Sequence, residues 1–367
     1  MAVEHSKVPR GTFCGRRRFA LPKRIQTHSL DSSTWNEESE FASGSTCFTW
    51  NTKWKASKGS GNVPRGTFGR KFHSITSVPR ETSCIPGAIL LSFRALGGLL
   101  ARIIAVANQK GGVGKTTTAV NLAACLAASE QSTLLVDCDS QANATAAIGF
   151  AKDPARRTLY QSLILNEPFD KIVQKSQVDG LDVVPADKNL AGAAVELVMA
   201  ENREYKLQAV LNEIRDRYKF IVLDCPPALD LLTLNALVSA SAVLVPIQCE
   251  YLALEGVSEL LDTLMRIRRT LNPSLEIEGI LLTMYDERTT LSRQVATDLR
   301  SFFGTQVFQS VIPRNVRLAE APSFGKPIIF YDIHSKGAEG YTQLAQEVIA
   351  NDEKRTGKRA RSADSGA

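Results

Sequence analysis

The 367-residue chain lacks cysteines at spacings that chemistry could use. Three of its seven cysteines are scattered through the first hundred residues, and the others lie in apolar or strand-like stretches, at Cys125, Cys138, Cys225 and Cys249. Zinc sites, iron–sulfur centres and disulfide frameworks require clustered or regularly spaced cysteines. The sequence therefore favours buried thiols in a reducing compartment.

Long apolar runs are also lacking. One stretch, from Ala88 to Ala107, approaches the length of a membrane span, but Arg94 and Arg102 interrupt it, and its second half is better interpreted as a strand. The amino terminus shows no charged segment followed by an apolar core, so it does not resemble a secretory signal. With 44% hydrophobic and 22% charged residues, the composition is that of a globular protein.

Acidic residues are scarce in one part of the chain. Residues 1–100 contain 15 Lys and Arg against 6 Asp and Glu, a net charge of +9, whereas residues 101–367 contain 29 against 32, a net charge of −3. The overall charge of +6 therefore comes entirely from the first segment, which also holds all three tryptophans. The chain looks like two unrelated sequences joined near residue 100.

The first hundred residues show no sustained helical or strand periodicity, but they contain a short repeat. Val8 to Phe13 (VPRGTF) recurs as Val63 to Phe68, and a partial third copy begins at Val78. We expect residues 1–100 to be a low-order basic extension. Three interpretations compete: a disordered arm that binds nucleic acid or a partner, a small folded domain, and translated upstream DNA.

From Arg102 onward the pattern changes to strand, glycine-rich loop and helix. Residues 103–107 form a short apolar run typical of a buried strand, and an apolar helical period follows the loop. Such a loop turns backbone N–H groups around phosphate oxygens, and the helix N-terminus adds its partial positive charge. We expect Lys115 to reach the β- and γ-phosphates and Thr116 to ligate Mg²⁺. The other expected loop ligands are Gly111, Gly112, Val113, Gly114 and Thr117.

Carboxylates follow two further apolar strands. One strand ends in Asp137, with Asp139 two residues later, and another ends in Asp224. Because the carboxyl ends of parallel strands face the ligand crevice of an open α/β sheet, these side chains are expected to meet the phosphate loop. Asp224 is placed to hold Mg²⁺ through water.

The rest of the chain alternates between strand and helix patterns, which predicts an α/β fold: a doubly wound, mostly parallel sheet with helices on both faces. Further strands are expected at residues 181–184, 242–247, 277–283 and 307–311. Further helices are expected at residues 204–217, 252–270, 291–303 and 337–349.

The loop carries an extra lysine, Lys110, at its head, and this resembles the deviant phosphate-loop ATPases that include the ParA, MinD and nitrogenase iron-protein groups. Within that class the sequence is most similar to the ParA/Soj chromosome-partitioning ATPases over about residues 102–350. Ser140 and Ala142 stand where the family usually has Pro and Gly, which predicts a tuned loop with hydrolysis retained. The supporting blocks are residues 107–109, 137–145, 224–227, 248–256, 282–286, 312–318 and 320–327.

The resemblance implies an ATP- and Mg²⁺-dependent ATP hydrolase that closes into a homodimer around two nucleotides. Lys110 would reach phosphates bound to the other subunit, which adds positive charge where charge develops. Asp139 would orient the attacking water, and Asp137 would support the Mg²⁺ site with Thr116 and Asp224. The implied catalytic residues are Lys110, Lys115 and Asp139, and Pro313 and Asn315 would border the adenine.

The family further implies double-stranded DNA binding without sequence preference, and a ParB-like partner that stimulates hydrolysis. This places the protein in the cytoplasm, on the nucleoid, moving a chromosome or plasmid. Because residues 101–350 carry 24 basic and 29 acidic residues, the bulk charge does not attract DNA. By resemblance the local patch includes Arg288 and Arg317, half of it from each subunit.

Three other functions compete. A MinD-like positioning ATPase would end in an amphipathic membrane helix, but residues 351–367 are polar and basic and have no apolar face, so no membrane partner and a disordered basic tail are expected. An iron–sulfur reductase would need cluster cysteines. A DNA-bound regulator that uses ATP only as a conformational switch would keep the same loop, so the sequence separates it poorly.

Family members commonly begin one or two residues before the first strand, whereas about 99 residues precede it here. The repeated VPRGT can be encoded by GTTCCACGTGGAAC, an inverted repeat that resembles the family's centromere site. We therefore expect residues 1 to about 99 to translate upstream DNA, with the true start near Leu99 or Leu100. The ATPase domain would then span residues 101–350, followed by the tail at 351–367.

Overall fold

The computed structural model describes residues 101–251 and 253–364, so the expectations for residues 1–100 concern a part of the chain that lies outside the described residues. The described residues build one eight-stranded sheet with the order β3-β4-β2-β5-β1-β6-β7-β8. All neighbouring pairs are parallel except the short edge pair β3–β4. The predicted doubly wound, mostly parallel sheet is confirmed. The strands are β1 (Arg102–Val106), β2 (Thr133–Asp137), β3 (Gln174–Lys175), β4 (Leu181–Val184), β5 (Phe220–Asp224), β6 (Ala242–Gln248), β7 (Glu276–Tyr285) and β8 (Val307–Pro313).

The central strands are apolar on both faces because helices cover both. In β1, Ile103 and Ala105 point into one hydrophobic cluster, and Ile104 and Val106 point into a second cluster on the opposite face. Residues alternate between the two faces of a strand, so a strand that is buried on both sides appears in the sequence as a continuous apolar run. The same alternation holds in β5, where neighbouring side chains enter opposite clusters.

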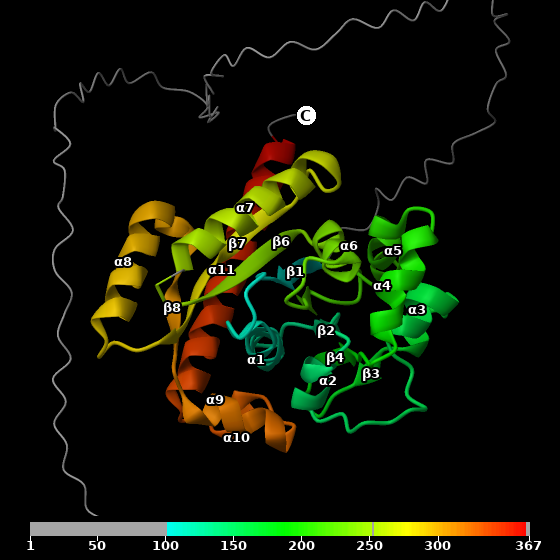
Figure 1. Ribbon diagram of the computed structural model, residues 1–367, viewed down its shortest axis with the longest axis horizontal. Helices are drawn as coiled ribbons and strands as arrows, with labels where there is room; N and C mark the ends of the chain where they lie inside the picture. Colours follow the sequence, from blue (N-terminus) through cyan, green and yellow to red (C-terminus); the bar gives the residue numbers. More distant parts are fainter. Residues whose placement is uncertain (1–100, 252, 365–367) are drawn as a thin grey trace, which may run out of the picture. The chain divides into compact units, whose positions relative to one another are not determined.

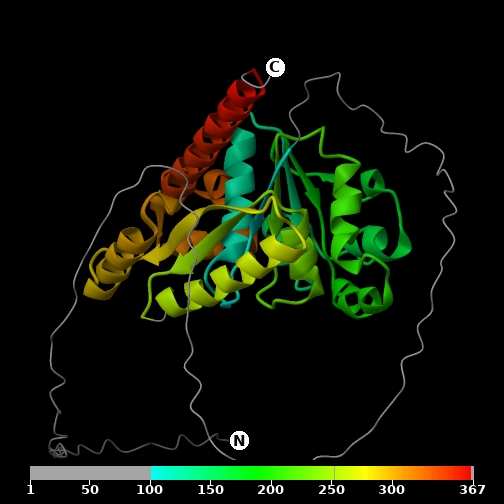
Figure 2. The same cartoon turned by 90° about the horizontal axis from the view of Figure 1, so that it is seen from above.

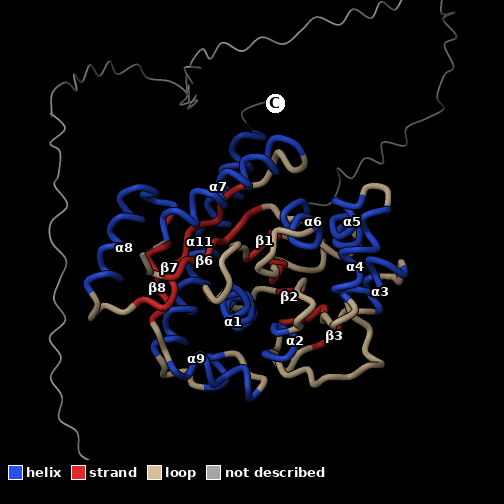
Figure 3. The backbone as a smooth tube through the Cα atoms, viewed as in Figure 1, coloured by secondary structure: helices blue, strands red, loops and turns tan. Residues whose placement is uncertain are grey.

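Helices lie on both sides of the sheet, as the blue and red segments of Figure 3 show. One face is covered by α1 (Lys115–Ala128), α2 (Asn143–Ala147), α9 (Val316–Glu320), α10 (Ile328–Tyr331) and α11 (Lys336–Asp364). The other is covered by α3 (Leu159–Leu165), α4 (Leu190–Glu196), α5 (Lys206–Asn212), α6 (Leu231–Ser239), α7 (Ala253–Thr270) and α8 (Thr290–Phe303). The helix expected at 204–217 is shorter, because tight turns follow Asn212 before β5 begins.

Strand β1 lies at the point where the chain changes direction across the sheet (Figure 1). From β1 the chain passes to β2 and β4 on one side, and from β5 it passes to β6, β7 and β8 on the other. Where neighbouring strands are followed by connections that run in opposite directions, a crevice opens at the carboxyl ends of those strands. The crevice is where the glycine-rich loop begins.

The tail expected to be disordered is helical instead. Helix α11 continues from Lys336 through Asp364, and its last turns extend past the rest of the folded body in Figure 2. Two causes account for the difference. Residues 351–367 are rich in Ala, Lys and Arg, which are good helix formers. In addition, Asp352 in the first turn of this segment pairs with Lys219 at 2.6 Å. None of the described helices is both long and apolar enough to cross a membrane.

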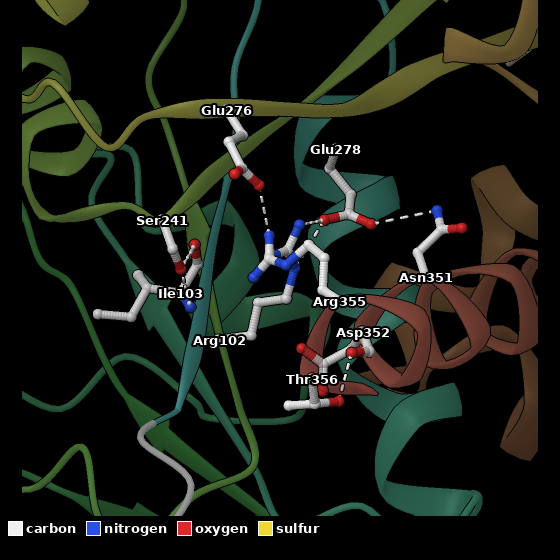
Figure 4. A network of polar contacts seen from close by, with 9 residues as sticks. All are labelled: Arg102, Ile103, Ser241, Glu276, Glu278, Asn351, Asp352, Arg355 and Thr356. Atoms are coloured by element: carbon white, nitrogen blue, oxygen red, sulfur yellow. Dashed lines mark hydrogen bonds and ion pairs between the residues drawn. The ribbon is translucent and has the colours of Figure 1, made fainter. Parts of the chain in front are cut away.

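Helix α11 is fixed to the amino-terminal edge of the sheet by a polar network (Figure 4). The Arg102 side chain at the start of β1 donates to Glu278 on β7, and both are almost fully buried. Asn351 of α11 donates to the other Glu278 oxygen at 3.4 Å, and Arg355 donates to Glu276 at 2.6 Å. The first strand, β7 and the last helix therefore share one cluster of charges.

The two glutamates of this network differ in burial, and this gives a matched test. Glu278→Gln leaves the Arg102 guanidinium buried without a counter-charge, and removing one partner of a buried pair costs about 3–5 kcal/mol. Glu276→Gln weakens a pair that is partly exposed, at 26% for Arg355 and 47% for Glu276, and should cost at most about 1 kcal/mol. Urea unfolding measures both. Equal losses in the two variants would contradict the buried character of the Arg102–Glu278 pair.

Candidate active site

The glycine-rich loop connects β1 to α1 at the crevice. Gly112 and Gly114 have φ angles of 74° and 88°, in the left-handed region that only glycine enters without strain. Gly114 lies at the N-cap position, and α1 begins at Lys115. The predicted order of strand, loop and helix is therefore present. It directs the N-terminus of α1, with its partial positive charge, toward the crevice.

Two side chains fix the loop from outside. Asn108 accepts a hydrogen bond from the Lys110 N–H at 2.9 Å and donates to the Pro246 carbonyl of β6 at 2.8 Å. Thr283 of β7 donates its hydroxyl to the Val113 carbonyl at 2.8 Å. Sequence reasoning gave neither residue a role, although both lie in blocks that carry the family resemblance. They tie the loop to β6 and β7.

Both lysines of the loop are engaged within the chain. Lys115 is 7% exposed, and its Nζ donates to the Lys110 carbonyl at 2.9 Å. Burial lowers the pKa of Lys115, and the charge of nearby Asp224 opposes this shift. The Lys110 ammonium donates at 3.0 Å to Glu250, which lies at the start of the connection from β6 to α7. The loop thus brings two cations to the place where phosphates would lie.

The predicted carboxylates meet at the same edge. Asp137 and Asp224 are register partners on β2 and β5, and neither is exposed to solvent. Asp137 accepts three hydrogen bonds, from the Thr145 N–H at 2.8 Å, the Thr145 hydroxyl at 2.7 Å and the Asp139 N–H at 3.1 Å. Asp139 lies at the start of the next connection, is 8% exposed, and accepts from the Gln141 N–H at 2.9 Å.

Asp224 differs from Asp137 because neither of its buried oxygens accepts a hydrogen bond of good geometry from the described residues, although the Thr116 hydroxyl lies close enough to affect it. Burial raises its pKa well above the ordinary value, and Asp137 adds to this shift, while the Thr116 hydroxyl and the Lys115 charge lower it. A buried carboxylate without a partner beside a threonine hydroxyl is a fitting environment for Mg²⁺. In the described part of the chain no group of three His, Cys, Asp or Glu could hold a metal ion alone, so phosphates and water would complete its coordination.

A depression with a volume of about 200 Å³ adjoins the loop. Pro313 and Asn315, the expected adenine neighbours, line it together with Gly114 and Thr117 of the loop. Met284 also lines it and has a φ of 50°, an uncommon backbone conformation for a side-chain-bearing residue. The structure therefore brings the expected base-binding residues and the phosphate loop to one cavity.

The two arginines expected to bind DNA follow the carboxyl ends of β7 and β8. Arg288 is 89% exposed and pairs with Asp286, and Arg317 is 56% exposed and pairs with Glu320 at 3.0 Å. Arg314, which sequence reasoning passed over, is also exposed in the β8 connection. Its N–H donates to the Tyr285 carbonyl of β7, so it lies on the same edge as Arg288.

The connection after Asp139 contains an alanine, Ala142, in a strained backbone conformation. Ala142 has a φ of 55°, so it occupies the left-handed region where glycine carries no penalty. A non-glycine residue pays about 1–2 kcal/mol there. Its N–H donates to the Asp139 carbonyl at 2.9 Å, which ties the strained residue to the aspartate. The connection beside Asp139 therefore contains one strained residue.

Asp137 and Asp224 allow the same substitution to be tested with opposite expected signs. In the nucleotide-free protein, Asp224→Asn removes a buried carboxylate without a partner and should stabilise the fold by about 1–3 kcal/mol at pH 7. Asp137→Asn turns one acceptor into a donor against Thr145 and should destabilise it. Because the folded-state pKa of Asp224 is raised above 3.8, its cost grows as the pH rises past that value. The gain from Asp224→Asn should therefore shrink between pH 7 and pH 4 in urea unfolding, and a pH-independent gain would contradict this.

Known proteins match the sequence of this chain. A family model described as an AAA domain matches residues 101–277. The chromosome partitioning protein ParA of Myxococcus xanthus is 50% identical over 258 residues, covering 70% of this chain and 91% of that protein. The sporulation initiation inhibitor protein Soj of Bacillus subtilis is 50% identical over 252 residues, covering 69% of this chain and all of the relative.

Solved structures agree on the fold. A cobyrinic acid a,c-diamide synthase from Mycobacterium smegmatis, with a bound ATP analog and magnesium, has a TM-score of 0.61 and 35% identity, covering 69% of this chain and 96% of that one. The cell division ATPase MinD of Pyrococcus furiosus has a TM-score of 0.58 and 28% identity, covering 68% and 99%. With a phosphate loop in place and relatives half identical over nine-tenths or more of their length, the chain belongs to the ParA/Soj family of chromosome-partitioning ATPases.

Proposed function

We propose that this protein hydrolyses ATP to ADP and phosphate in a homodimer that forms on ATP binding, binds DNA without sequence preference and partitions a chromosome or plasmid. The observation that carries the proposal is the meeting of Lys110, Lys115 and the unpartnered Asp224 at one edge of the sheet. Two cations and a free carboxylate suit a nucleotide triphosphate with its metal ion.

The chain's own residues would bind ATP and Mg²⁺ as follows. Thr116 and Asp224 would hold the metal ion, with Asp137 behind them, and the backbone of residues 110–117 would enclose the phosphates. Pro313 and Asn315 would border the base. Bound Mg²⁺ supplies charge neutralisation for the phosphates. The Mycobacterium smegmatis structure with an ATP analog and magnesium, 35% identical to this chain, supports this choice of ligands.

Hydrolysis would depend on placing water and on stabilising charge. Asp139 would accept a hydrogen bond from the attacking water and hold it in line with the terminal phosphate. The Gln141 N–H in turn holds Asp139 in position. Lys115 would leave the Lys110 carbonyl for the phosphates. The ammonium of Lys110, 45% exposed at the edge of the site, would reach the nucleotide of the partner subunit. Positive charge would then be greatest where the transition state becomes more negative.

DNA binding would follow from dimerisation. The described ATPase domain is slightly acidic, so a single subunit offers only a local patch around Arg288, Arg314 and Arg317. Two such patches on one dimer double the number of phosphate contacts, and affinity depends steeply on that number. A ParB-like partner would stimulate hydrolysis and release the dimer from DNA. The protein would then act in the cytoplasm, on the nucleoid.

Two variants separate dimerisation from hydrolysis. Lys110→Ala should abolish MgATP-dependent dimerisation and, with it, DNA retention and phosphate release. Asp139→Ala should still dimerise and stay on DNA, while phosphate release falls by about 100-fold or more. Light scattering, DNA retention and phosphate release give the three measurements. If the wild type releases no phosphate with DNA and a ParB-like partner present, the protein is instead a regulator that uses ATP as a conformational ligand.

A salt titration tests the DNA patch. Arg317→Ala removes one phosphate contact per subunit, so the slope of log affinity against log salt should become shallower by about 2 for the dimer. Arg268→Ala, at the far end of α7 near the amino-terminal edge of the sheet, removes the same charge elsewhere and should leave the slope unchanged. Equal slopes in all three proteins would remove Arg317 from the interface.

A further inference from the structure

Lys110 has a counter-ion in its own subunit, and nothing in the function proposed above accounts for it. Its ammonium lies 3.0 Å from a Glu250 oxygen, and the two side chains are 45% and 47% exposed. The Lys110 backbone is fixed on both sides, by Asn108 at its N–H and by Lys115 at its carbonyl. The side chain is thus the free part of an otherwise anchored residue, and Glu250 decides where it lies.

Glu250 is itself held in place. Its other carboxylate oxygen accepts from the Gln248 side-chain amide, and its N–H donates to the Gln248 carbonyl at 2.8 Å. The preceding residue, Cys249, donates its N–H to the Thr283 carbonyl at 3.3 Å. Thr283 also holds the phosphate loop through Val113. Glu250 and Lys110 are therefore mounted on one connected frame, which keeps the acceptor beside the ammonium.

We propose that Glu250 is a positioning residue that holds Lys110 within its own subunit until the phosphates of an ATP-bound partner take the ammonium. Glu250 thereby sets the ATP concentration at which the dimer closes. This inference rests on the dimerisation proposed above and assigns to Glu250 the control of that step.

The strength of the Lys110–Glu250 pair implies that Glu250 raises the ATP concentration needed for dimerisation but does not prevent it. The Lys110 ammonium has three hydrogen-bond donors. A triphosphate offers it several charged oxygens, whereas Glu250 offers one carboxylate, so the ammonium binds the triphosphate more strongly. Breaking the Lys110–Glu250 ion pair still costs free energy in each subunit. A pair this exposed contributes about 0.2–1 kcal/mol, which corresponds to about 1.4- to 5-fold in an equilibrium constant. Since both subunits make the exchange, the effect on the dimer is counted twice.

The test compares Glu250→Gln with a matched control. Glu213→Gln removes the same charge from an exposed residue just after α5, near the amino-terminal edge of the sheet. Light scattering over a MgATP titration gives the concentration for half-maximal dimerisation. Glu250→Gln should lower it by about 1.4- to 5-fold, the factor for one subunit, because two ATP molecules bind as the two pairs are exchanged. Glu213→Gln should leave it unchanged. A merely structural role for Glu250 would lower the thermal unfolding midpoint of Glu250→Gln and leave its MgATP midpoint unchanged.

A second measurement separates the release of Lys110 from a direct effect on the nucleotide site. MgADP lacks the terminal phosphate and does not close the dimer, so its affinity for the monomer should be equal in wild type and Glu250→Gln. If MgADP affinity changes as much as the MgATP midpoint, Glu250 acts on the site itself and the inference is wrong. It is also wrong if the MgATP midpoint is unchanged or raised.

The proposed function and this inference fail in different ways. A wild-type protein that stays monomeric at saturating MgATP overturns the proposed function, and the inference with it. A wild-type protein that dimerises, together with a Glu250→Gln variant that dimerises no more readily, overturns the inference alone. Glu250→Asp keeps the charge but shortens the side chain, so it should lie between the wild type and Glu250→Gln in its MgATP midpoint.

Discussion

Two aspartates in register on neighbouring parallel strands are the constraint on which this structure depends. Asp137 and Asp224 end β2 and β5 side by side and are fully buried, so their charges repel in a medium that screens them poorly. The fold resolves the conflict unequally: three hydrogen bonds satisfy Asp137, while Asp224 is left without one. A free buried carboxylate costs stability in the absence of a ligand, and it is an acceptor ready for a cation.

The lysines are the other half of this balance. Lys115 is buried near Asp224 and lends it positive charge, yet its own ammonium reaches only a backbone carbonyl. Lys110 lies further out and pairs with Glu250. The arrangement therefore keeps its cations close to the crevice through weak, local contacts that a polyphosphate can replace. The fold loses stability at the carboxyl-terminal edge of the sheet, and ligand binding at that edge would restore it.

The architecture explains why the site lies where it does. The sheet order places β1 between β5 and β6, so the loop after β1 is flanked by the aspartate of one neighbour and the Gln248–Glu250 connection of the other. Asn108 and Thr283 fasten the loop to β6 and β7. At the opposite edge, the buried Arg102–Glu278 pair joins the first strand to β7, and Asn351 of the last helix donates to the same glutamate. Ligand contacts and stabilising contacts thus lie at opposite ends of the strands.

The sequence by itself determined the fold class, the phosphate loop and the aspartates, because these depend on local patterns: apolar runs that end in a carboxylate, and glycines before a helical period. It misjudged the tail, since ion pairs such as Lys219–Asp352 join residues far apart in the chain. It also gave no role to Asn108, Thr283 or Arg314. Only the tertiary structure decided that Asp224 lacks a partner while Asp137 has three, and that Glu250 holds Lys110. The physical reason is that burial and hydrogen bonding depend on residues that are close in space but distant in sequence. The spacing of residues along the chain does not show which of them meet.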